Sequence, residues 1–156
     1  MTEIRVIVVD DHIIVREGLK ALLELEPDIQ VVYAAASSME CLDVLETYTP
    51  HAVFVDLKMP GVGGIEATRL IKHSRPQTKV ILLTNYDDEA YVVEAIKAGA
   101  DGYVLKDVKE GELARILRLV NEGCSYIDPS VTNKVFQQLK DADLTKQPEP
   151  RIALSQ

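Results

Sequence analysis

Five short apolar runs, rich in β-branched residues, alternate with segments of helical spacing along the first two thirds of the chain. The runs occupy positions 4–9, 30–34, 52–55, 79–83 and 102–105. They lack the alternation of apolar and polar residues that marks a half-buried strand, which predicts strands buried on both faces, as in parallel sheets. Parallel strands joined by helices require right-handed crossovers, with helices on both faces of the sheet. The pattern therefore predicts an α/β fold, a doubly wound (βα)5 three-layer sandwich.

Element boundaries follow local signals. Ser37 with Glu40 three positions later forms a capping-box pattern, and Gly99 stands where a helix would end in a left-handed residue. After residue 122 the β/α pattern stops, and Asp128 followed by Pro129 predicts the start of a sixth helix over 130–142. From Asp141 the sequence becomes polar and proline-containing, as linkers are. We expect one domain over 1–124 and a linker helix with a tail over 125–156.

The sixth predicted helix carries one apolar stripe, formed by Val131, Val135 and Leu139. Such a stripe needs an apolar partner to leave water. The partner could be the domain over 1–124, a second chain or a further domain, and a frayed amphipathic end remained an alternative.

Charge and composition exclude several classes of protein. The 156 residues include 17 Lys and Arg against 25 Asp and Glu, for a formal charge of −8, so the chain lacks the basic surface that neutralises nucleic-acid phosphates. Its two cysteines, Cys41 and Cys124, do not form a disulfide framework or a zinc motif. No signal peptide or apolar run of membrane-spanning length is present. We expect a cytoplasmic protein with no membrane partner.

Chemistry is expected at the carboxyl ends of the strands, where ligands bind to open parallel sheets. The polar residues that stand there are Asp10, Asp11, Asp56, Thr84 and Lys106. Three carboxylates in one site repel one another unless a cation offsets them, and oxygen ligands of this kind suit Mg²⁺ or Mn²⁺. No imidazole or thiol is expected to converge there as zinc would require, because the three histidines, His12, His51 and His73, are interpreted as loop or surface residues.

A carboxylate beside such a cation can attack a phosphoryl group and form an acyl phosphate. The transfer depends mainly on positioning and charge stabilisation, so the useful neighbours are a metal ion, an ammonium group and a hydroxyl donor. Lys106 and Thr84 supply the last two.

Several stretches of the sequence resemble the receiver domains of two-component response regulators, over about residues 3–122. The similarity rests on Val8-Val9-Asp10-Asp11-His12, Val55-Asp56-Leu57-Lys58-Met59-Pro60-Gly61, Leu83-Thr84 and Gly99-Ala100-Asp101-Gly102-Tyr103-Val104-Leu105-Lys106. The sequence Val15-Arg16-Glu17-Gly18-Leu19 and the pair Lys106-Asp107 are similar to the branch whose output is a LuxR/NarL/FixJ-type helix-turn-helix. The resemblance implies a CheY-like, flavodoxin-like five-stranded parallel sheet in the order 2-1-3-4-5.

The same resemblance implies roles for individual residues. Asp56 would be the phosphoacceptor, and Asp10 and Asp11 the acidic pair that binds Mg²⁺, with Asp11 a direct ligand and Asp10 acting through water. The backbone carbonyl of Lys58 would be a further ligand, and Lys106 would pair with the phosphoryl group.

Thr84 and Tyr103 would be coupled switch residues, the hydroxyl moving towards the phosphoryl group and the ring turning into the vacated space. A half-buried aromatic at the edge of the sheet remained the alternative for Tyr103. We also expect Lys58 and Tyr86, each two positions beyond a strand-end residue, to tune the lifetime of the acyl phosphate.

The resemblance also implies partners. A sensor histidine kinase would supply the phosphoryl group, and phosphorylation would favour a homodimer through either the fourth and fifth or the first and fifth helices. The last residues, Ile152-Ala153-Leu154-Ser155-Gln156, are similar to the start of a LuxR-type DNA-binding domain. We expect DNA binding only through such a C-terminal domain, absent from this sequence, and therefore a piece of a longer regulator rather than a natural single-domain receiver.

Three alternatives stay open. The chain could be a receiver-like interaction module that works without phosphorylation. An aspartate-nucleophile phosphatase would need Asp-x-Asp after the first strand, where this chain has Asp10-Asp11. A nucleotide- or flavin-binding sandwich would need a Gly- or Ser/Thr-rich loop there. In the preferred reading the chain is not an enzyme beyond its own phosphotransfer and slow autodephosphorylation.

Overall fold

Six parallel strands form one sheet in the computed structural model, which describes residues 2–85, 89–109 and 111–146. Their order is β2-β1-β3-β4-β5-β6. The five long strands match the five apolar runs of the sequence to within one residue at each end. The bounds are β1 (Ile4–Val9), β2 (Ile29–Ala35), β3 (Ala52–Asp56), β4 (Lys79–Thr84), β5 (Gly102–Leu105) and β6 (Tyr126–Ile127).

The predicted order 2-1-3-4-5 is confirmed, but the sheet has one strand more than predicted. β6 pairs in parallel with β5 through the register Gly102–Tyr126 and Tyr103–Ile127. Two residues are too few for a periodic pattern in the sequence, so β6 is identified only by its pairing with β5.

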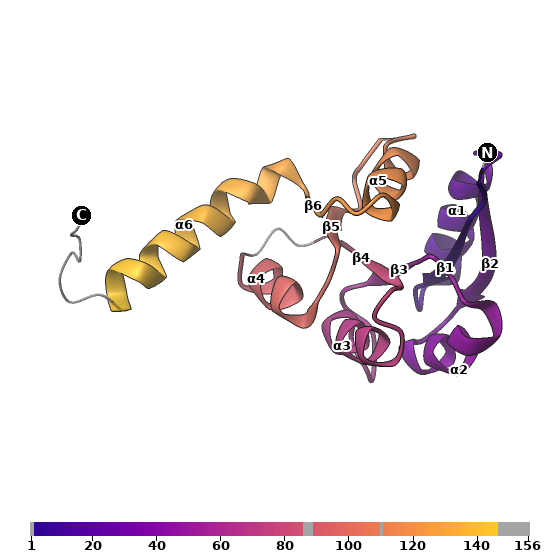
Figure 1. Ribbon diagram of the computed structural model, residues 1–156, viewed down its shortest axis with the longest axis horizontal. Coiled ribbons are helices and arrows are strands. Elements are labelled where there is room, and N and C mark those ends of the chain that lie inside the picture. The colour runs from indigo at the N-terminus through magenta and orange to yellow at the C-terminus, as the bar shows by residue number, and fades with distance from the viewer. Residues whose placement is uncertain (1, 86–88, 110, 147–156) are drawn as a thin grey trace.

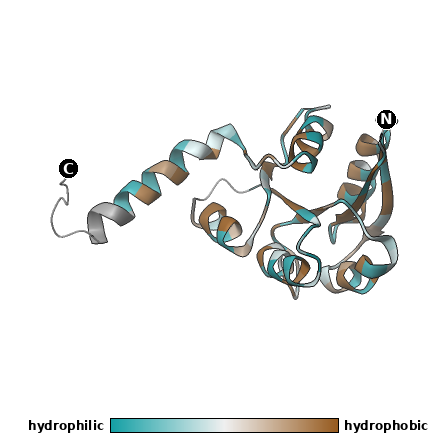
Figure 2. Ribbon diagram, in the orientation of Figure 1, coloured by the Kyte–Doolittle hydropathy of each residue, from teal (hydrophilic) through white to brown (hydrophobic). Residues whose placement is uncertain are grey.

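Helices cover both faces of the sheet, as predicted (Figure 1). Successive residues of a strand point to opposite faces, so Val6 and Val8 of β1 pack in the cluster with α1 and α5. Ile7 and Val9 pack in the cluster on the side of α2, α3 and α4. The interior strands are accordingly mostly hydrophobic, with polar residues near their ends (Figure 2). The helices are α1 (Ile13–Glu24), α2 (Ser38–Tyr48), α3 (Gly64–Ser74), α4 (Glu89–Ala98), α5 (Glu112–Asn121) and α6 (Pro129–Lys146).

Two predicted boundary signals are confirmed. The backbone N–H of Glu40 donates to Ser37 Oγ at 3.1 Å, and the Glu40 carboxylate accepts from the N–H of Ala36 at 2.9 Å. Gly99 ends α4 with φ of +103°, a backbone conformation that costs glycine little. The first signal lies at the carboxyl edge of the sheet, where β2 leads into α2, and the second lies at the amino edge, where α4 leads into β5.

Helix α6 begins as the sequence predicts, because the N–H of Ser130 donates to the Asp128 carboxylate at 3.0 Å. The helix extends to Lys146, four residues further than predicted. Val131 and Val135 are buried in the same cluster as the helices that cover that face, whereas Leu139 is 50% exposed. The first two turns of α6 therefore pack on this domain, and the rest of the helix extends away from the sheet (Figure 1). None of the helices in the described ranges is both long and apolar enough to cross a lipid bilayer.

Candidate functional site

The carboxyl edge of the sheet gathers the charged residues that the sequence placed at strand ends. Asp10 and Asp11 follow β1, Asp56 is the last residue of β3, and Lys106 follows β5. β1 and β3 are paired neighbours, so their ends bring the carboxylates together. Asp10 is fully buried, and Asp56 is only 6% exposed. We call this group of four residues the acidic rim.

Lys106 bridges two of the three carboxylates. Its Nζ lies 2.9 Å from Asp56 Oδ1 and 3.2 Å from Asp10 Oδ2. The lysine is held in place by its backbone, since its N–H donates to the carbonyl of Thr84 at 2.8 Å. The acidic rim thus contains one ammonium group and three carboxylates, and it keeps an excess of negative charge.

The two partners of the shorter ion pair have shifted pKa values. Burial raises the pKa of Asp56 above its ordinary value; Lys106 opposes this shift, while the charges of Asp10 and Asp11 add to it. Burial alone would lower the pKa of Lys106, but the hydrogen bond and charge of Asp56, with the charge of Asp10, raise it on balance. Lys106 is therefore cationic at neutral pH, and the site gains from any further positive charge.

The donor set fits a divalent cation. Ligand atoms from Asp10, Asp11, His12 and Asp56 all lie within 4.8 Å of one another. Asp11 Oδ1 is buried and has no hydrogen-bond partner, and a buried carboxylate oxygen without a partner is costly unless a cation approaches it. In contrast, Asp10 accepts a hydrogen bond at each oxygen, from the His12 N–H at 2.9 Å and from Lys106 at 3.2 Å. Asp11 is thus the more available direct ligand.

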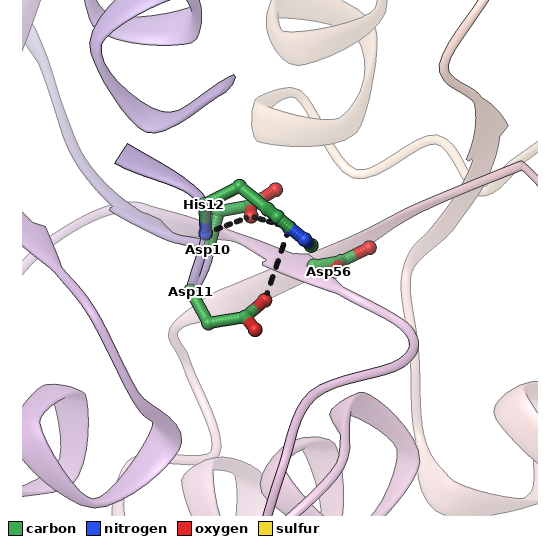
Figure 3. Close-up of side chains that lie close together, drawn as sticks. All are labelled: Asp10, Asp11, His12 and Asp56. Carbon is green, nitrogen blue, oxygen red and sulfur yellow. Dashed lines mark hydrogen bonds and ion pairs between the residues drawn. The ribbon is translucent and has the colours of Figure 1, made fainter. Parts of the chain in front are cut away.

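The expectation that no imidazole converges on the carboxylates is wrong for His12. Its Nδ1 lies 3.2 Å from Asp10 Oδ1 and 3.3 Å from Asp11 Oδ1 (Figure 3). The backbone causes this, because the His12 N–H donates to Asp10 Oδ1 and turns the loop back over the acidic pair. The position of His12 directly after two strand-end aspartates was the signal in the sequence.

The two predicted switch residues are both buried. Thr84 is the last residue of β4, and β4 lies between β3 and β5 in the sheet. Tyr103 on β5 is 1% exposed, so it is not the half-buried aromatic of the alternative reading. Its cluster includes Val131 and Val135 of α6 as well as residues of α4. Their switch roles remain predictions.

The structure describes one of the two predicted lifetime-tuning residues, Lys58. The Lys58 Nζ lies 4.7 Å from the centroid of the Tyr91 ring on α4, a cation–π distance that links the loop after β3 to that helix. Lys58 is exposed, and its roles through the side chain and through the backbone carbonyl remain predictions. Tyr86 lies outside the described residues.

Two residues that support the acidic rim were not singled out from the sequence. A Cβ added at Gly64 would lie 2.5 Å from the Asp56 carbonyl oxygen and 2.9 Å from the Leu57 Cα. The start of α3 can therefore approach the end of β3 only with glycine there. Arg16 on α1 donates to the Asp10 carbonyl at 2.8 Å. The Gly63-Gly64 pair before an apolar helix was the only sequence signal for the first, and proximity to the acidic pair for the second.

Comparisons with known proteins agree with this geometry. Residues 6–118 match the response regulator receiver domain family, and the chain belongs to that family. It is a signalling module of the two-component type rather than a classical enzyme.

Relatives place it beside LuxR-family transcription regulators. The chain is 36% identical over 138 residues to the transcriptional regulatory protein DegU of Brevibacillus brevis, an alignment that covers 88% of this chain and 58% of that protein. A LuxR-family response regulator from Aurantimonas sp. SI85-9A1 superposes with a TM-score of 0.84 at 34% identity, covering 89% of this chain and 99% of that one. The isolated receiver domain of RcsB from Salmonella enterica serovar Typhimurium, solved with the phosphomimetic BeF3−, superposes with a TM-score of 0.77 at 28% identity. The superposition covers 85% of this chain and 98% of that one.

Proposed function

We propose that Asp56 accepts a phosphoryl group from a sensor histidine kinase and that the resulting acyl phosphate controls a transcription-regulating output. The observation that carries the proposal is the pairing of Lys106 with Asp56 at 2.9 Å beside two further carboxylates. A structural ion pair has no need of the surplus negative charge, whereas a phosphotransfer site uses it to hold a cation.

In the proposed reaction a carboxylate oxygen of Asp56 attacks phosphorus, and the phosphorus–nitrogen bond of the kinase phosphohistidine breaks. The leaving imidazole retains the bond electrons and takes a proton. Lys106 orients the Asp56 carboxylate beforehand and then neutralises phosphoryl oxygens. Asp11, Asp56 and the Lys58 carbonyl would hold a divalent cation, Mg²⁺ or Mn²⁺, with Asp10 acting through water, and the cation would supply the remaining charge stabilisation.

The output follows from a population shift. A phosphoryl group adds up to about two negative charges and three strong acceptor oxygens, so it favours the state in which Thr84 donates to it. Tyr103, which packs with α4 and α6, would report that state to the surface. The differential contacts of the phosphoryl group with the two states set the size of the shift.

The wider assembly is part of this proposal. The RcsB protein is described in one solved structure as two dimers bound to two parallel DNAs, and we propose that the present chain likewise works as a homodimer when phosphorylated. The division into a receiver over 1–124 and a linker over 125–156, leading to a LuxR-type DNA-binding domain, belongs to the same proposal. β6 and the first turns of α6 pack on the receiver, so that linker is anchored at its start.

The deciding experiment is phosphorylation with acetyl phosphate and Mg²⁺. We expect one hydroxylamine-labile adduct per chain by intact mass, absent in Asp56→Asn and retained in the control Asp101→Asn, whose carboxylate lies at the opposite end of the sheet. Absence of any adduct in the wild-type chain would favour an interaction module that works without phosphorylation. Rapid multiple turnover would favour a phosphatase.

The lifetime of the adduct tests the two tuning residues. We expect Lys58→Ala and Tyr86→Ala to change the rate of dephosphorylation without abolishing phosphorylation, measured by decay of the adduct after removal of donor. Unchanged decay in both variants would contradict this part of the proposal.

A further inference from the structure

The imidazole of His12 covers the solvent side of the acidic rim. Its Nδ1 lies 3.2 Å from Asp10 Oδ1 and 3.3 Å from Asp11 Oδ1 (Figure 3). The His12 side chain is 67% exposed, whereas that of Asp10 is fully buried. The ring is therefore placed where a cation that enters from solvent would meet the two carboxylates.

The position of the ring is not needed to orient the acidic pair. The backbone N–H of His12 already donates to Asp10 Oδ1 at 2.9 Å, and Lys106 lies 3.2 Å from the other oxygen. Asp11 Oδ1 has no hydrogen-bond partner although Nδ1 is only 3.3 Å away. Nδ1 forms a hydrogen bond with Asp10 Oδ1 at 3.2 Å, so the ring is held over the acidic pair. Its contact with Asp11 brings a nitrogen and a carboxylate oxygen together without a hydrogen bond between them.

The separations agree with those of neighbouring ligands around one ion. Octahedral coordination with bonds of about 2.1 Å places adjacent donor atoms roughly 3.0 Å apart. The two distances from Nδ1 to carboxylate oxygens are 3.2 and 3.3 Å, and all four candidate donor atoms lie within 4.8 Å of one another. Small side-chain rotations would bring Nδ1 and the oxygens of Asp11 and Asp56 into one coordination sphere, with Asp10 linked to the ion through water.

We propose that His12 Nδ1 is a ligand of the divalent cation at the acidic rim. This inference rests on the proposed function, because it concerns the cation that assists phosphotransfer to Asp56. A mixed nitrogen and oxygen donor set changes the preference of the site, since imidazole suits transition metals whereas Mg²⁺ prefers oxygen. The acidic rim therefore discriminates in favour of Mn²⁺ and related ions more strongly than a site built from carboxylates alone.

Pulsed EPR of the Mn²⁺ complex of the full chain tests the ligand directly. Nitrogen bound to Mn²⁺ gives a hyperfine modulation, and biosynthetic labelling with ¹⁵N-histidine changes that modulation only if the nitrogen belongs to histidine. We expect the ¹⁵N pattern in the labelled wild-type complex, its loss in His12→Ala, and its retention in His73→Ala, a matched change at an exposed histidine on α3. The wild-type measurement decides the question even if the His12 variant folds poorly.

Two outcomes would overturn the proposal: Mn²⁺ bound in an Asp11-dependent manner without histidine coupling, or no Mn²⁺ binding at all. The proposed function fails separately, by absence of the Asp56 adduct with acetyl phosphate and Mg²⁺. Histidine coupling in a protein that forms no adduct would leave the ligand assignment intact and refute phosphotransfer.

Affinities provide a second measurement. We expect His12→Ala to weaken Mn²⁺ binding about tenfold and Mg²⁺ binding by about twofold or less, because the lost donor favours the transition metal. His73→Ala should change neither value. Titration of the Mn²⁺ EPR signal, with Mg²⁺ as competitor, yields both constants, and an equal loss for the two ions would contradict the predicted selectivity.

Discussion

The two ends of the sheet each hold a lysine–aspartate pair, and they differ in how completely the charges are satisfied. At the amino end, Lys72 Nζ lies 2.9 Å from Asp101 Oδ2 and also donates to the carbonyls of Pro76 and Thr78. Asp101 accepts a further bond from the N–H of Val80 at 2.9 Å. That pair closes its own network of hydrogen bonds.

At the carboxyl end, Lys106 pairs with Asp10 and Asp56, and Asp11 Oδ1 is buried without a hydrogen bond. The same two residue types thus form a structural clamp at one end and an acidic rim with unbalanced charge at the other. Imbalance of this kind costs stability and is retained where a site must bind or react. The comparison predicts that neutralising an acid will have opposite effects at the two ends.

The largest effect is expected where the backbone that shapes the acidic rim has no room for a side chain. Gly64→Ala places a methyl group 2.5 Å from the Asp56 carbonyl, which should cost about 3 kcal/mol of unfolding free energy and slow phosphorylation. Gly18→Ala, in α1 with nothing within 4 Å of the added Cβ, should instead stabilise by about 0.5–1 kcal/mol. Urea unfolding of both variants tests this, and equal stabilities would contradict it.

The next largest loss of stability is expected at the structural clamp, the pair formed by Lys72 and Asp101. Asp101→Ala removes the acceptor shared by Lys72 and the Val80 N–H, and we expect a loss of about 2 kcal/mol. Phosphorylation of Asp56 should persist under conditions where the variant is folded. A variant as stable as the wild type would show that this end of the sheet carries no more than a solvated pair.

At the acidic rim, neutralising an acid should raise the free energy of unfolding instead of lowering it. Asp11→Asn removes one of the repelling charges and breaks no hydrogen bond at Oδ1, so we expect stabilisation of about 1 kcal/mol in the presence of a chelator. Added Mg²⁺ should raise the melting temperature of the wild type and have little effect on the variant. Thermal unfolding with and without Mg²⁺ distinguishes the two, and destabilisation by Asp11→Asn in chelator would invalidate the comparison.

The smallest effect concerns pH. Burial raises the pKa of Asp56 in the folded state, so the folded chain binds that proton more tightly than the unfolded chain. The contribution of Asp56 to stability is therefore fully present below its unfolded pKa and is lost as pH rises through the raised folded value. In chelator, the stability of Asp56→Asn relative to the wild type should increase from acidic to neutral pH. Unfolding curves across that range measure the difference, and a constant or falling difference would contradict the shift.

The sequence alone determined the succession of strands and helices along the chain and the acidic character of one edge of the sheet. Apolar runs without alternation can be buried only between two layers, and strand-end residues such as Asp10, Asp56 and Lys106 must then share one edge of a parallel sheet.

Only the tertiary structure decided the two-residue strand β6, the burial of Val131 and Val135 of α6 against the domain, and the place of the His12 ring. Each depends on contacts between segments or on the direction of one side chain. The apolar stripe of the sixth helix was visible in the sequence, but its partner was not, and β6 and the His12 ring leave no periodic signal. The pattern of hydrophobic residues specifies which surfaces must be buried, whereas the packing of those surfaces decides which polar atoms meet.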